Sequence, residues 1–469
     1  MDFRIESDSI GSKEVPTEAY YGVQTLRAAE NFNITGYKLN TELVKSLVQI
    51  KKAAAIANYK AGLLNENIEK AIIEACDKIL RGNLQDQFIL DPIQGGAGTS
   101  ANMNANEVIA NEAIQILGGK KGDYSIVHPN DHVNMGQSTN DVFPTAGKIT
   151  ALKLLLKAIE QLKKLDITLE IKAKDFNNII KMGRTQLQDA VPIRLGQEFK
   201  AYSSVIKRDI SRLEATKKEL EVLNLGGTAI GTGINADNRY MNTVVPILSD
   251  IIGIQLEQAD DLIDATQNLD GFVSVSGAIK TCAVNLSKMA NDLRLMSSGP
   301  RTGLEEINLP AKQNGSSIMP GKVNPVIPEV MTQVAFNIIG NDVTITMAAE
   351  AGQLELNAFE PVIFFNLFES IETLTNGVKT FTENCISGIT ANTNRCKKLV
   401  DNSVGIVTAI TPYVGYEKAA SIAKSAIKTG KPVKEIILQN GILKESELDR
   451  ILDPISMTEP KELKKYEFA

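Results

Sequence analysis

The fold is decided by residues 144–174, which read PTAGKITALKLLLKAIEQLKKLDITLEIKAK. After Pro144 the stretch has no further proline and no cluster of glycines, and its aliphatic residues recur at spacings of three and four. These residues are Leu152, Leu155, Leu156, Ile159, Leu162, Leu165 and Leu169. The spacing is typical of an amphipathic helix. A helix of this length spans about 45 Å.

Comparable helical runs are found at about 191–224, 258–297, 326–350 and 361–390. Because few strand signals separate them, they predict an elongated helical bundle, and the fold class is all-α. Residues 273–290 place small or aliphatic side chains on several sides of one helix. A helix that is apolar all round is usually buried, so we expect the bundle to continue across subunits in a homo-oligomer.

Proline and glycine positions predict three domains. The first begins with a small, partly β segment over residues 1–40, followed by helices at about 41–59, 66–81 and 102–117. The predicted domains are a mostly helical N-terminal domain at 1–139, a central long-helix bundle at 140–394 that forms the oligomer core, and a small C-terminal helical domain at 395–469.

The composition argues against several classes of protein. A net charge of −6 on 50 basic and 56 acidic residues gives no basic footprint for nucleic acid. No apolar run is long enough for a membrane span, and the first residues lack the apolar region of a signal peptide. The four cysteines lie far apart without a C-x-x-C pair. We therefore expect a reduced, cytoplasmic protein.

Neither a metal nor a cofactor is predicted. The only histidines, His128 and His132, lie in one HPNDH stretch and have no partner at metal-ligand spacing. A structural or hydrogen-bonding role is the stronger hypothesis for them. The glycine-rich stretch at 226–233 lacks the G-x-G-x-x-G spacing and a Walker lysine, so we interpret it as a turn rather than a nucleotide loop.

Four short polar stretches precede predicted helices, at 95–100, 137–141, 183–189 and 315–325. Helix N-termini carry unpaired N–H groups and about half a unit of positive charge. If the four stretches converge, they form a site for a small anion with more than one carboxylate. The alternative is ordinary helix capping, for which Ser, Thr and Asn are preferred. Capping needs one such residue, whereas these stretches supply several.

The last stretch, Gly-Ser-Ser-Ile-Met-Pro-Gly-Lys-Val-Asn-Pro at 315–325, is either a bundle turn or a movable catalytic loop. A favoured reaction for such a polar set is proton abstraction next to a carboxylate, followed by β-elimination through a doubly charged aci-carboxylate. A serine is a poor base unless its alkoxide is stabilised, which backbone N–H groups and Lys322 in a closed loop would do. Chemistry alone leaves the base open among Ser316, Ser317 and Lys322.

The same run resembles the signature Gly-Ser-Ser-x-Met-Pro-x-Lys-x-Asn-Pro of the aspartase/fumarase superfamily, and the resemblance extends over essentially the whole chain. Residues 19–25, 95–100, 138–141 and 326–330 resemble the members that reversibly convert L-aspartate to fumarate and ammonia. The alternative is the hydratase reaction of L-malate to fumarate and water, whose enzymes typically read Ser-Ser-Asn-Asp at the second polar stretch. A third hypothesis is a helical protein without catalysis, like the related lens crystallins.

The resemblance implies a role for each matching position. Ser316 would be the general base that removes the Cβ proton, and Ser317 would help bind the β-carboxylate. Asn140 would sit near the amino group. The other positions would bind carboxylates: Thr99, Ser138 and Thr139 the β-carboxylate and the aci-carboxylate it becomes, and Lys322 and Asn324 the α-carboxylate, with Thr185 and Gln186 beside them.

The resemblance also implies a three-domain helical chain that forms a homotetramer around a twenty-helix core, with each active site shared between three subunits. The expected partner is a small dicarboxylate, with no cofactor. Three residues depart from the pattern. Gln186 stands where many relatives have histidine and offers only neutral hydrogen bonds, while Gly227 and Phe359 look closer to the hydratases.

Overall fold

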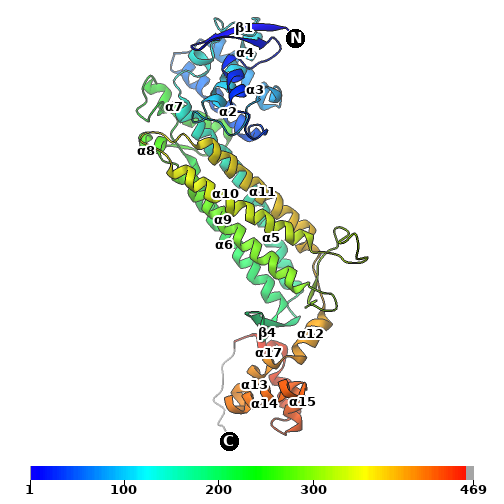
Figure 1. Ribbon diagram of the computed structural model, residues 1–469. Helices are drawn as coiled ribbons and strands as arrows, with labels where there is room; N and C mark the ends of the chain where they lie inside the picture. Colours follow the sequence, from blue (N-terminus) through cyan, green and yellow to red (C-terminus); the bar gives the residue numbers. More distant parts are fainter. Residues whose placement is uncertain (1, 461–469) are drawn as a thin grey trace. The chain divides into compact units, whose positions relative to one another are not determined.

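The computed structural model describes residues 2–460, and most of them are helical (Figure 1), which confirms the all-α class. The chain forms two compact units: unit 1 comprises 1–159, 211–283 and 336–375, and unit 2 comprises 160–210, 284–335 and 376–469. The division into three domains stays a prediction. The long helices each contribute one part to each unit: α5 (Thr139–Asp175), α6 (Leu195–Glu221), α9 (Asp270–Met296), α10 (Val326–Glu350) and α11 (Glu360–Asn384).

Unit 1 contains the N-terminal β-hairpin and a group of shorter helices (Figure 1). Helix α2 packs against α3 and α7, and its Leu47 and Ile50 are fully buried. The elements are β1 (Phe3–Asp8), β2 (Gly11–Pro16), α1 (Val23–Asn31), α2 (Thr41–Lys60), α3 (Glu66–Leu80), α4 (Thr99–Ile116), α7 (Asn238–Ile252), α8 (Leu262–Gln267) and the parallel pair β5 (Val222–Leu223) and β6 (Glu257–Gln258).

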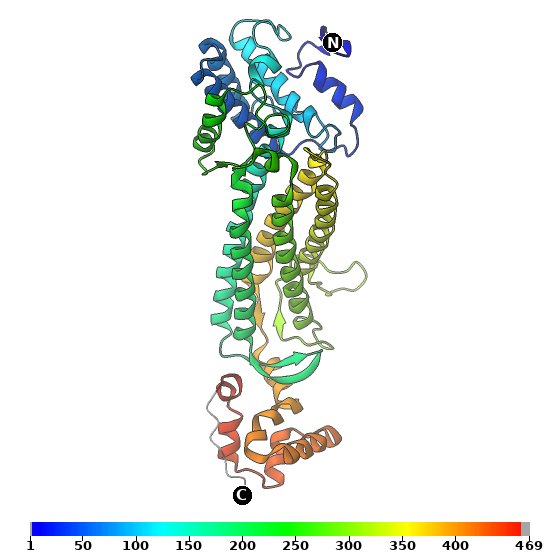
Figure 2. The same ribbon diagram turned by 90° about the vertical axis from the view of Figure 1, so that its left-hand side faces the viewer.

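Close packing of α5, α9 and α11 forms an aromatic core in unit 1. The ring of Phe364 lies 5.1 Å from that of Phe143 and 5.0 Å from that of Phe272, measured between centroids. Gly147 makes room for this contact, because a Cβ at that position would lie 2.1 Å from the Phe364 ring. Within each unit the parts of the long helices lie side by side (Figure 2).

Unit 2 contains the hairpin of β3 (Ile180–Thr185) and β4 (Gln188–Arg194) and the C-terminal helices. A buried apolar cluster that includes Ile410, Ile437 and Leu448 holds these helices together, and α12 packs against β3. The other elements are β7 (Ile307–Asn308), β8 (Thr390–Ala391), α12 (Thr393–Asn402), α13 (Val407–Val414), α14 (Tyr416–Thr429), α15 (Val433–Gln439), α16 (Glu445–Ile451) and α17 (Pro454–Thr458).

Helix α5 begins at Thr139, five residues before the proline at which the sequence placed its start. Proline has no N–H, so Pro144 cannot donate to the carbonyl of Asn140 four residues earlier. The Asn224 side chain donates to that carbonyl instead, at 3.0 Å. A distant amide therefore satisfies the orphaned group, and the helix continues through the proline.

Two other predicted helices have different bounds. The run at 258–297 is divided into β6, α8 and α9, because Asp261 caps α8 and the chain is extended at Asn268. The run at 191–224 is helical only from Leu195, since the residues before it form the β3–β4 hairpin. The predicted helices at 41–59, 66–81 and 102–117 are confirmed as α2, α3 and α4.

Candidate active site

The stretch Gln137–Asp141 lies at the start of helix α5 in unit 1, and two of its hydroxyl oxygens accept hydrogen bonds from the protein. The Thr139 hydroxyl accepts a hydrogen bond from Asn102 Nδ2 at 3.1 Å, and the Ser138 hydroxyl accepts one from Asn140 N at 3.2 Å. A hydroxyl that accepts from the protein keeps its own hydrogen for another acceptor. Both side chains are therefore prepared to donate to an anion at the start of the helix.

Thr99 begins helix α4, which also lies in unit 1. The residue before it, Gly98, has φ +84°, and a Cβ there would lie 2.3 Å from the Phe143 ring. Only glycine permits both this backbone conformation and this close approach. The glycine thus brings the exposed N-terminus of α4 close to the first turns of α5.

Asn140 is held by one backbone group and one side chain of its own unit. Its Nδ2 donates to Ala229 O at 2.7 Å, and its carbonyl accepts from Asn224 as described above. Because Nδ2 of Asn140 faces the carbonyl of Ala229, the Oδ1 atom of Asn140 remains available as an acceptor. An acceptor at this position suits an ammonium group better than a carboxylate.

Two buried ionisable groups support this stretch: Asp141, which belongs to the predicted stretch 137–141, and Lys51, which the sequence reasoning missed. Lys51 donates to Asn134 Oδ1 at 2.8 Å and to Gln137 Oε1 at 2.9 Å, and burial lowers its pKa to about 7. Asp141 accepts from the N–H groups of Ser138 (2.9 Å), Gly226 (3.0 Å) and Thr228 (3.1 Å), and burial raises its pKa to about 6. In the sequence, Lys51 belongs to an Ile-Lys-Lys-Ala run that looks like an ordinary amphipathic helix.

Thr185 and Gln186 do not lie at a helix N-terminus, which corrects the sequence prediction for 183–189. They lie at the tip of the β3–β4 hairpin in unit 2, where Gln186 and Leu187 have φ of 55° and 62°. Two consecutive residues with positive φ are characteristic of the two-residue turns that connect the strands of a β-hairpin. All three side chains are exposed.

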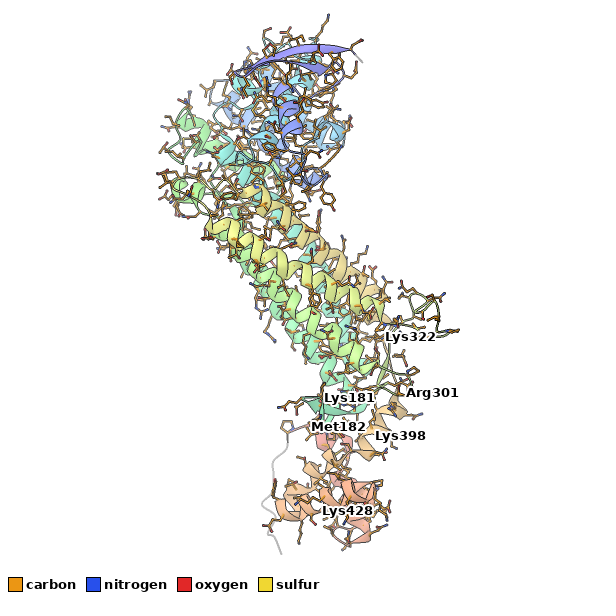
Figure 3. The ribbon with its side chains drawn as sticks, viewed as in Figure 1. Lys181, Met182, Arg301, Lys322, Lys398 and Lys428 are labelled. Atoms are coloured by element: carbon orange, nitrogen blue, oxygen red, sulfur yellow. The ribbon has the colours of Figure 1, made fainter. Side chains whose placement is uncertain are left out.

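The signature loop at 315–325 lies in unit 2, with Lys322 in it (Figure 3). The Ser316 hydroxyl oxygen accepts from the N–H groups of Ile318 at 3.3 Å and Met319 at 2.9 Å. Asn324 Nδ2 donates to Gly315 O at 2.6 Å, which ties the two ends of the loop together. Ser317 is exposed.

A cavity of about 640 Å³ lies beside this loop in unit 2. Lys322 and Asn324 line it, together with Arg294 and Glu329, whose charged groups are 3.8 Å apart. Lys322 and Asn324, which the resemblance assigns to the α-carboxylate, therefore line the same cavity. The structure thus brings Ser316, Lys322 and Asn324 together in one loop of unit 2, and Thr99, Ser138, Thr139 and Asn140 in unit 1.

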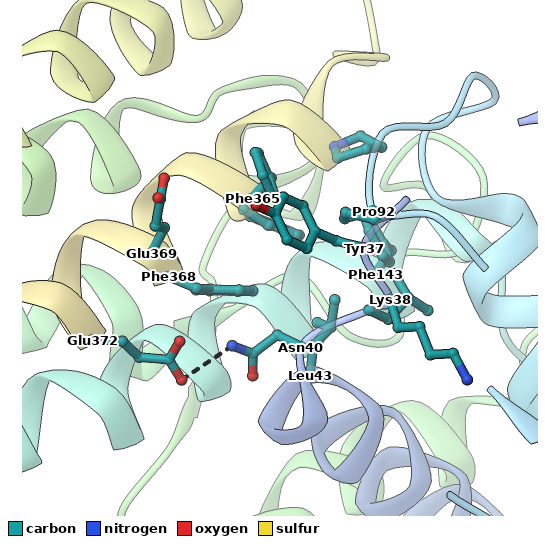
Figure 4. Close-up of a pocket in the computed structure, with 13 residues that line it drawn as sticks. Tyr37, Lys38, Asn40, Leu43, Pro92, Phe143, Phe365, Phe368, Glu369 and Glu372 are labelled. Atoms are coloured by element: carbon teal, nitrogen blue, oxygen red, sulfur yellow. Dashed lines mark hydrogen bonds between the residues drawn. The ribbon is translucent and has the colours of Figure 1, made fainter. Parts of the chain in front are cut away.

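An aromatic cavity of about 310 Å³ in unit 1 contains none of the predicted site residues (Figure 4). Phe364, Phe365 and Phe368 of α11 line it, and at its edge Asn40 donates to Glu372 at 3.2 Å. Its apolar lining offers few donors for a small dicarboxylate. The loop cavity is therefore the better candidate.

The HPNDH histidines have the hydrogen-bonding role that the sequence favoured. His128 Nδ1 accepts from the N–H groups of Asn130 and Asp131, and His132 Nδ1 accepts from His128 N at 2.9 Å. Among residues 2–460, no group of three or more His, Cys, Asp or Glu side chains is arranged to hold a metal ion. Within the same range, no helix is both long enough and apolar enough to cross a membrane.

Comparisons with known proteins support this fold and identify the family. Residues 11–340 match the family model described as lyase, and residues 406–459 match the model of the fumarase C C-terminus. A fumarate lyase:delta crystallin from Brucella melitensis, in a crystal structure bound to cobalt, is 51% identical with a TM-score of 0.96, covering 98% of this chain and 100% of that one. The class II fumarase of Schistosoma mansoni is 36% identical with a TM-score of 0.94, covering 97% and 99%.

The long-helix fold and the signature loop, together with these matches, define the class of protein: the chain belongs to the lyase family of the aspartase/fumarase superfamily. Within that family its similarity to one group of enzymes is high. The aspartate ammonia-lyase of Bacillus subtilis (strain 168) is 56% identical over 459 residues, which cover 98% of this chain and 97% of that protein.

Proposed function

We propose that the protein catalyses the aspartate ammonia-lyase reaction, the reversible elimination of ammonia from L-aspartate to give fumarate. The observation that carries the proposal is the 56% identity to an aspartate ammonia-lyase over 98% of the chain. The signature run with Ser316, Lys322 and Asn324 lies inside the matched region. No metal or cofactor is part of the proposal.

Ser316 is the proposed base. Two backbone N–H groups point at its oxygen, and such donors stabilise a serine alkoxide, which lowers the cost of using serine as a base. The base takes the proton from Cβ, and the electrons of the broken C–H bond move into the β-carboxylate to give the aci-carboxylate. When these electrons return to form the double bond, the C–N bond breaks and ammonia leaves.

Neutral donors and one cation hold the two carboxylates in this proposal. Thr99, Ser138 and Thr139 donate to the β-carboxylate, with help from Ser317, and the free hydroxyl hydrogens described above suit that role. Lys322 and Asn324 bind the α-carboxylate, with Thr185 and Gln186 beside them. Asn140 accepts from the substrate ammonium. Because Gln186 is a neutral amide, it contributes orientation rather than charge.

The partner is a small dicarboxylate, and the proposed assembly is a cytoplasmic homotetramer with each active site shared between three subunits. Helix α10 supports association, because Phe336, Val343 and Met347 recur at helical spacing and are 65%, 56% and 64% exposed. An apolar stripe of this kind on one helix marks a protein interface. The four cysteines lie far apart in the sequence without a C-x-x-C pair, which supports a reduced, cytoplasmic location.

Replacing Phe336 by glutamate is expected to dissociate the assembly and abolish activity together. The added charge would be buried without a partner in the proposed interface, which is unfavourable. Light scattering after size-exclusion chromatography measures the mass, and the same fractions are assayed. Tyr416→Glu is the matched control, because Tyr416 on α14 is 79% exposed and should tolerate the charge. A Phe336→Glu protein that stays tetrameric would contradict the interface.

Incubation with L-aspartate is expected to produce fumarate, and incubation with L-malate is not. Fumarate absorbance in the ultraviolet follows both reactions with the same enzyme preparation. The nearest alternative is the hydratase reaction, which the 36% identity to a class II fumarase and the residues Gly227 and Phe359 favour. Turnover of L-malate without L-aspartate would establish that alternative. Turnover of neither substrate by the folded protein would favour a structural role of the crystallin kind.

A further inference from the structure

We propose that Glu306 is a positioning residue that holds the hairpin tip carrying Thr185 and Gln186. This inference deepens the proposed function and rests on it, because these two residues are the proposed neighbours of the α-carboxylate. Glu306 lies in the segment between α9 and the signature loop, and its side chain is fully buried. All residues in the argument belong to unit 2.

Two cations of strand β3 surround the Glu306 carboxylate. Arg184 Nη1 lies 2.8 Å from its Oε1, and Lys181 Nζ lies 3.4 Å from its Oε2. Both cations also donate to the carbonyl of Met182 between them, Lys181 at 3.2 Å and Arg184 at 3.3 Å. Figure 3 shows Lys181 and Met182 in the hairpin. One buried carboxylate thus pairs with two cations of the same strand, three positions apart.

The two cations depend on Glu306 to different degrees. Lys181 also forms an ion pair with Glu198 of α6 at 3.1 Å, so it keeps a carboxylate when Glu306 is neutralised. Within residues 2–460, the ion-pair partner of Arg184 is Glu306. The Arg184 side chain is only 14% exposed, so the loss of its partner is unfavourable and favours its movement toward water. Arg184 is adjacent to Thr185, so its movement displaces the tip.

The backbone of Glu306 is held in place by neighbouring elements. Glu306 N donates to Met296 O at 2.8 Å, and Glu306 O accepts from Asn392 N at 2.9 Å. The next residue, Ile307, pairs with Ala391 in the β7–β8 ladder. Glu306 is therefore fixed between the end of α9 and the start of α12, so it can hold the hairpin in a defined position.

The hairpin tip requires an anchor elsewhere in the unit, because its own side chains are exposed and its turn has two residues with positive φ. Strand β4 has a separate anchor, in which the Ser403 hydroxyl donates to Asp189 at 2.7 Å. The Glu306–Arg184 pair is the corresponding anchor of β3. With both strands held, Thr185 and Gln186 have a defined position for a carboxylate.

Glu306→Gln is expected to raise both the KM for L-aspartate and the Kd for succinate about tenfold or more, because small displacements of a binding group have large effects. Steady-state kinetics measures the first and isothermal titration calorimetry the second. Lys181→Met is the matched control: it removes the other ion pair of Glu306 but leaves Arg184 in place. We expect it to lower the melting temperature without raising KM or Kd.

The same substitution in a variant of the hairpin tip distinguishes a positioning role of Glu306 from general destabilisation of the protein. When Thr185 and Gln186 are both already replaced by alanine, Glu306→Gln should raise KM and Kd by less than threefold, since the two groups that it positions have gone. Equal effects of Glu306→Gln and Lys181→Met, or full effects of Glu306→Gln in the variant that lacks both Thr185 and Gln186, would overturn the inference. If Glu306→Gln fails to fold, Arg184→Met breaks the same pair from the other side, and its effects on KM and Kd decide.

The proposed function is tested separately by turnover of L-aspartate in the wild-type protein. Succinate binding requires no turnover, so it reports on Glu306 even if the reaction is a different one. Failure to deaminate L-aspartate would therefore count against the reaction, whereas unchanged succinate affinity in Glu306→Gln would count against the positioning role.

Discussion

Replacing Ser316 by alanine is expected to lower kcat for L-aspartate about 10³-fold or more, because a positioned general base contributes roughly 10²–10⁴-fold. The hydroxyl oxygen that takes the proton would be gone, while the backbone N–H groups of Ile318 and Met319 that now point at it would remain. Fumarate absorbance measures the loss of turnover. Nuclear magnetic resonance in deuterated buffer measures a second consequence, the loss of hydrogen exchange at Cβ of the substrate.

Ser317→Ala is the matched control for this change, because the two serines are neighbours in the same loop. Ser317 is proposed to bind the β-carboxylate, so its loss should act mainly on KM. The helical content and the assembly state of both variants should equal those of the wild type. Retained Cβ exchange in Ser316→Ala would show that another group is the base, and equal kcat losses in the two variants would leave the base unassigned between them.

Replacing Lys322 by methionine is expected to lower kcat/KM about 10²- to 10³-fold, because truncating one partner of a hydrogen-bonded charge pair is strongly unfavourable. Lys322 lines the cavity beside the loop and is the cation that we assign to the α-carboxylate. Methionine keeps the apolar stem and removes only the charge. Initial rates over a range of L-aspartate concentrations measure the effect, and calorimetry with succinate measures the loss of binding.

Lys312→Met is the control for the Lys322 prediction. Lys312 is an exposed lysine ten residues earlier in the same connecting segment, so the change in net charge is equal. We expect its kcat/KM to stay within about threefold of the wild type, as for a surface charge that is not in the site. If Lys312→Met lost as much activity as Lys322→Met, the effect would come from the overall field and not from a direct contact.

The predictions for Ser316 and Lys322 both assume that the signature loop closes over the bound substrate. In the structure Ile318 is 82% exposed and Met319 is 49% exposed, which is unusual for apolar side chains in the same short loop. Burial of these two side chains over a bound substrate would contribute to closure through the hydrophobic effect. It would also exclude water from Ser316 and Lys322, which strengthens their electrostatic interactions with the substrate.

Much of the site was predictable because its residues are neighbours in sequence. Ser316, Ser317, Lys322 and Asn324 occupy one loop, and Ser138, Thr139 and Asn140 occupy one helix start. Their composition alone indicates donors for a carboxylate. Lys51 and Glu306 were not predictable in this way, since each is far in sequence from the residues that it supports. Neither lysine in a helix nor glutamate in a connecting segment carries a signal of burial.

The sequence by itself determined the all-α class, the long helices and the polar composition of the loop at 315–325, because helical periodicity and local motifs depend on residues close together in the chain. Only the tertiary structure decided where α5 begins, since the amide of Asn224 satisfies the carbonyl that Pro144 leaves unpaired. Only the tertiary structure placed Thr185 and Gln186 on a hairpin, which the buried Glu306 and the Ser403–Asp189 bond hold in position. In each case the deciding interaction joins residues more than 80 positions apart, which no local pattern records.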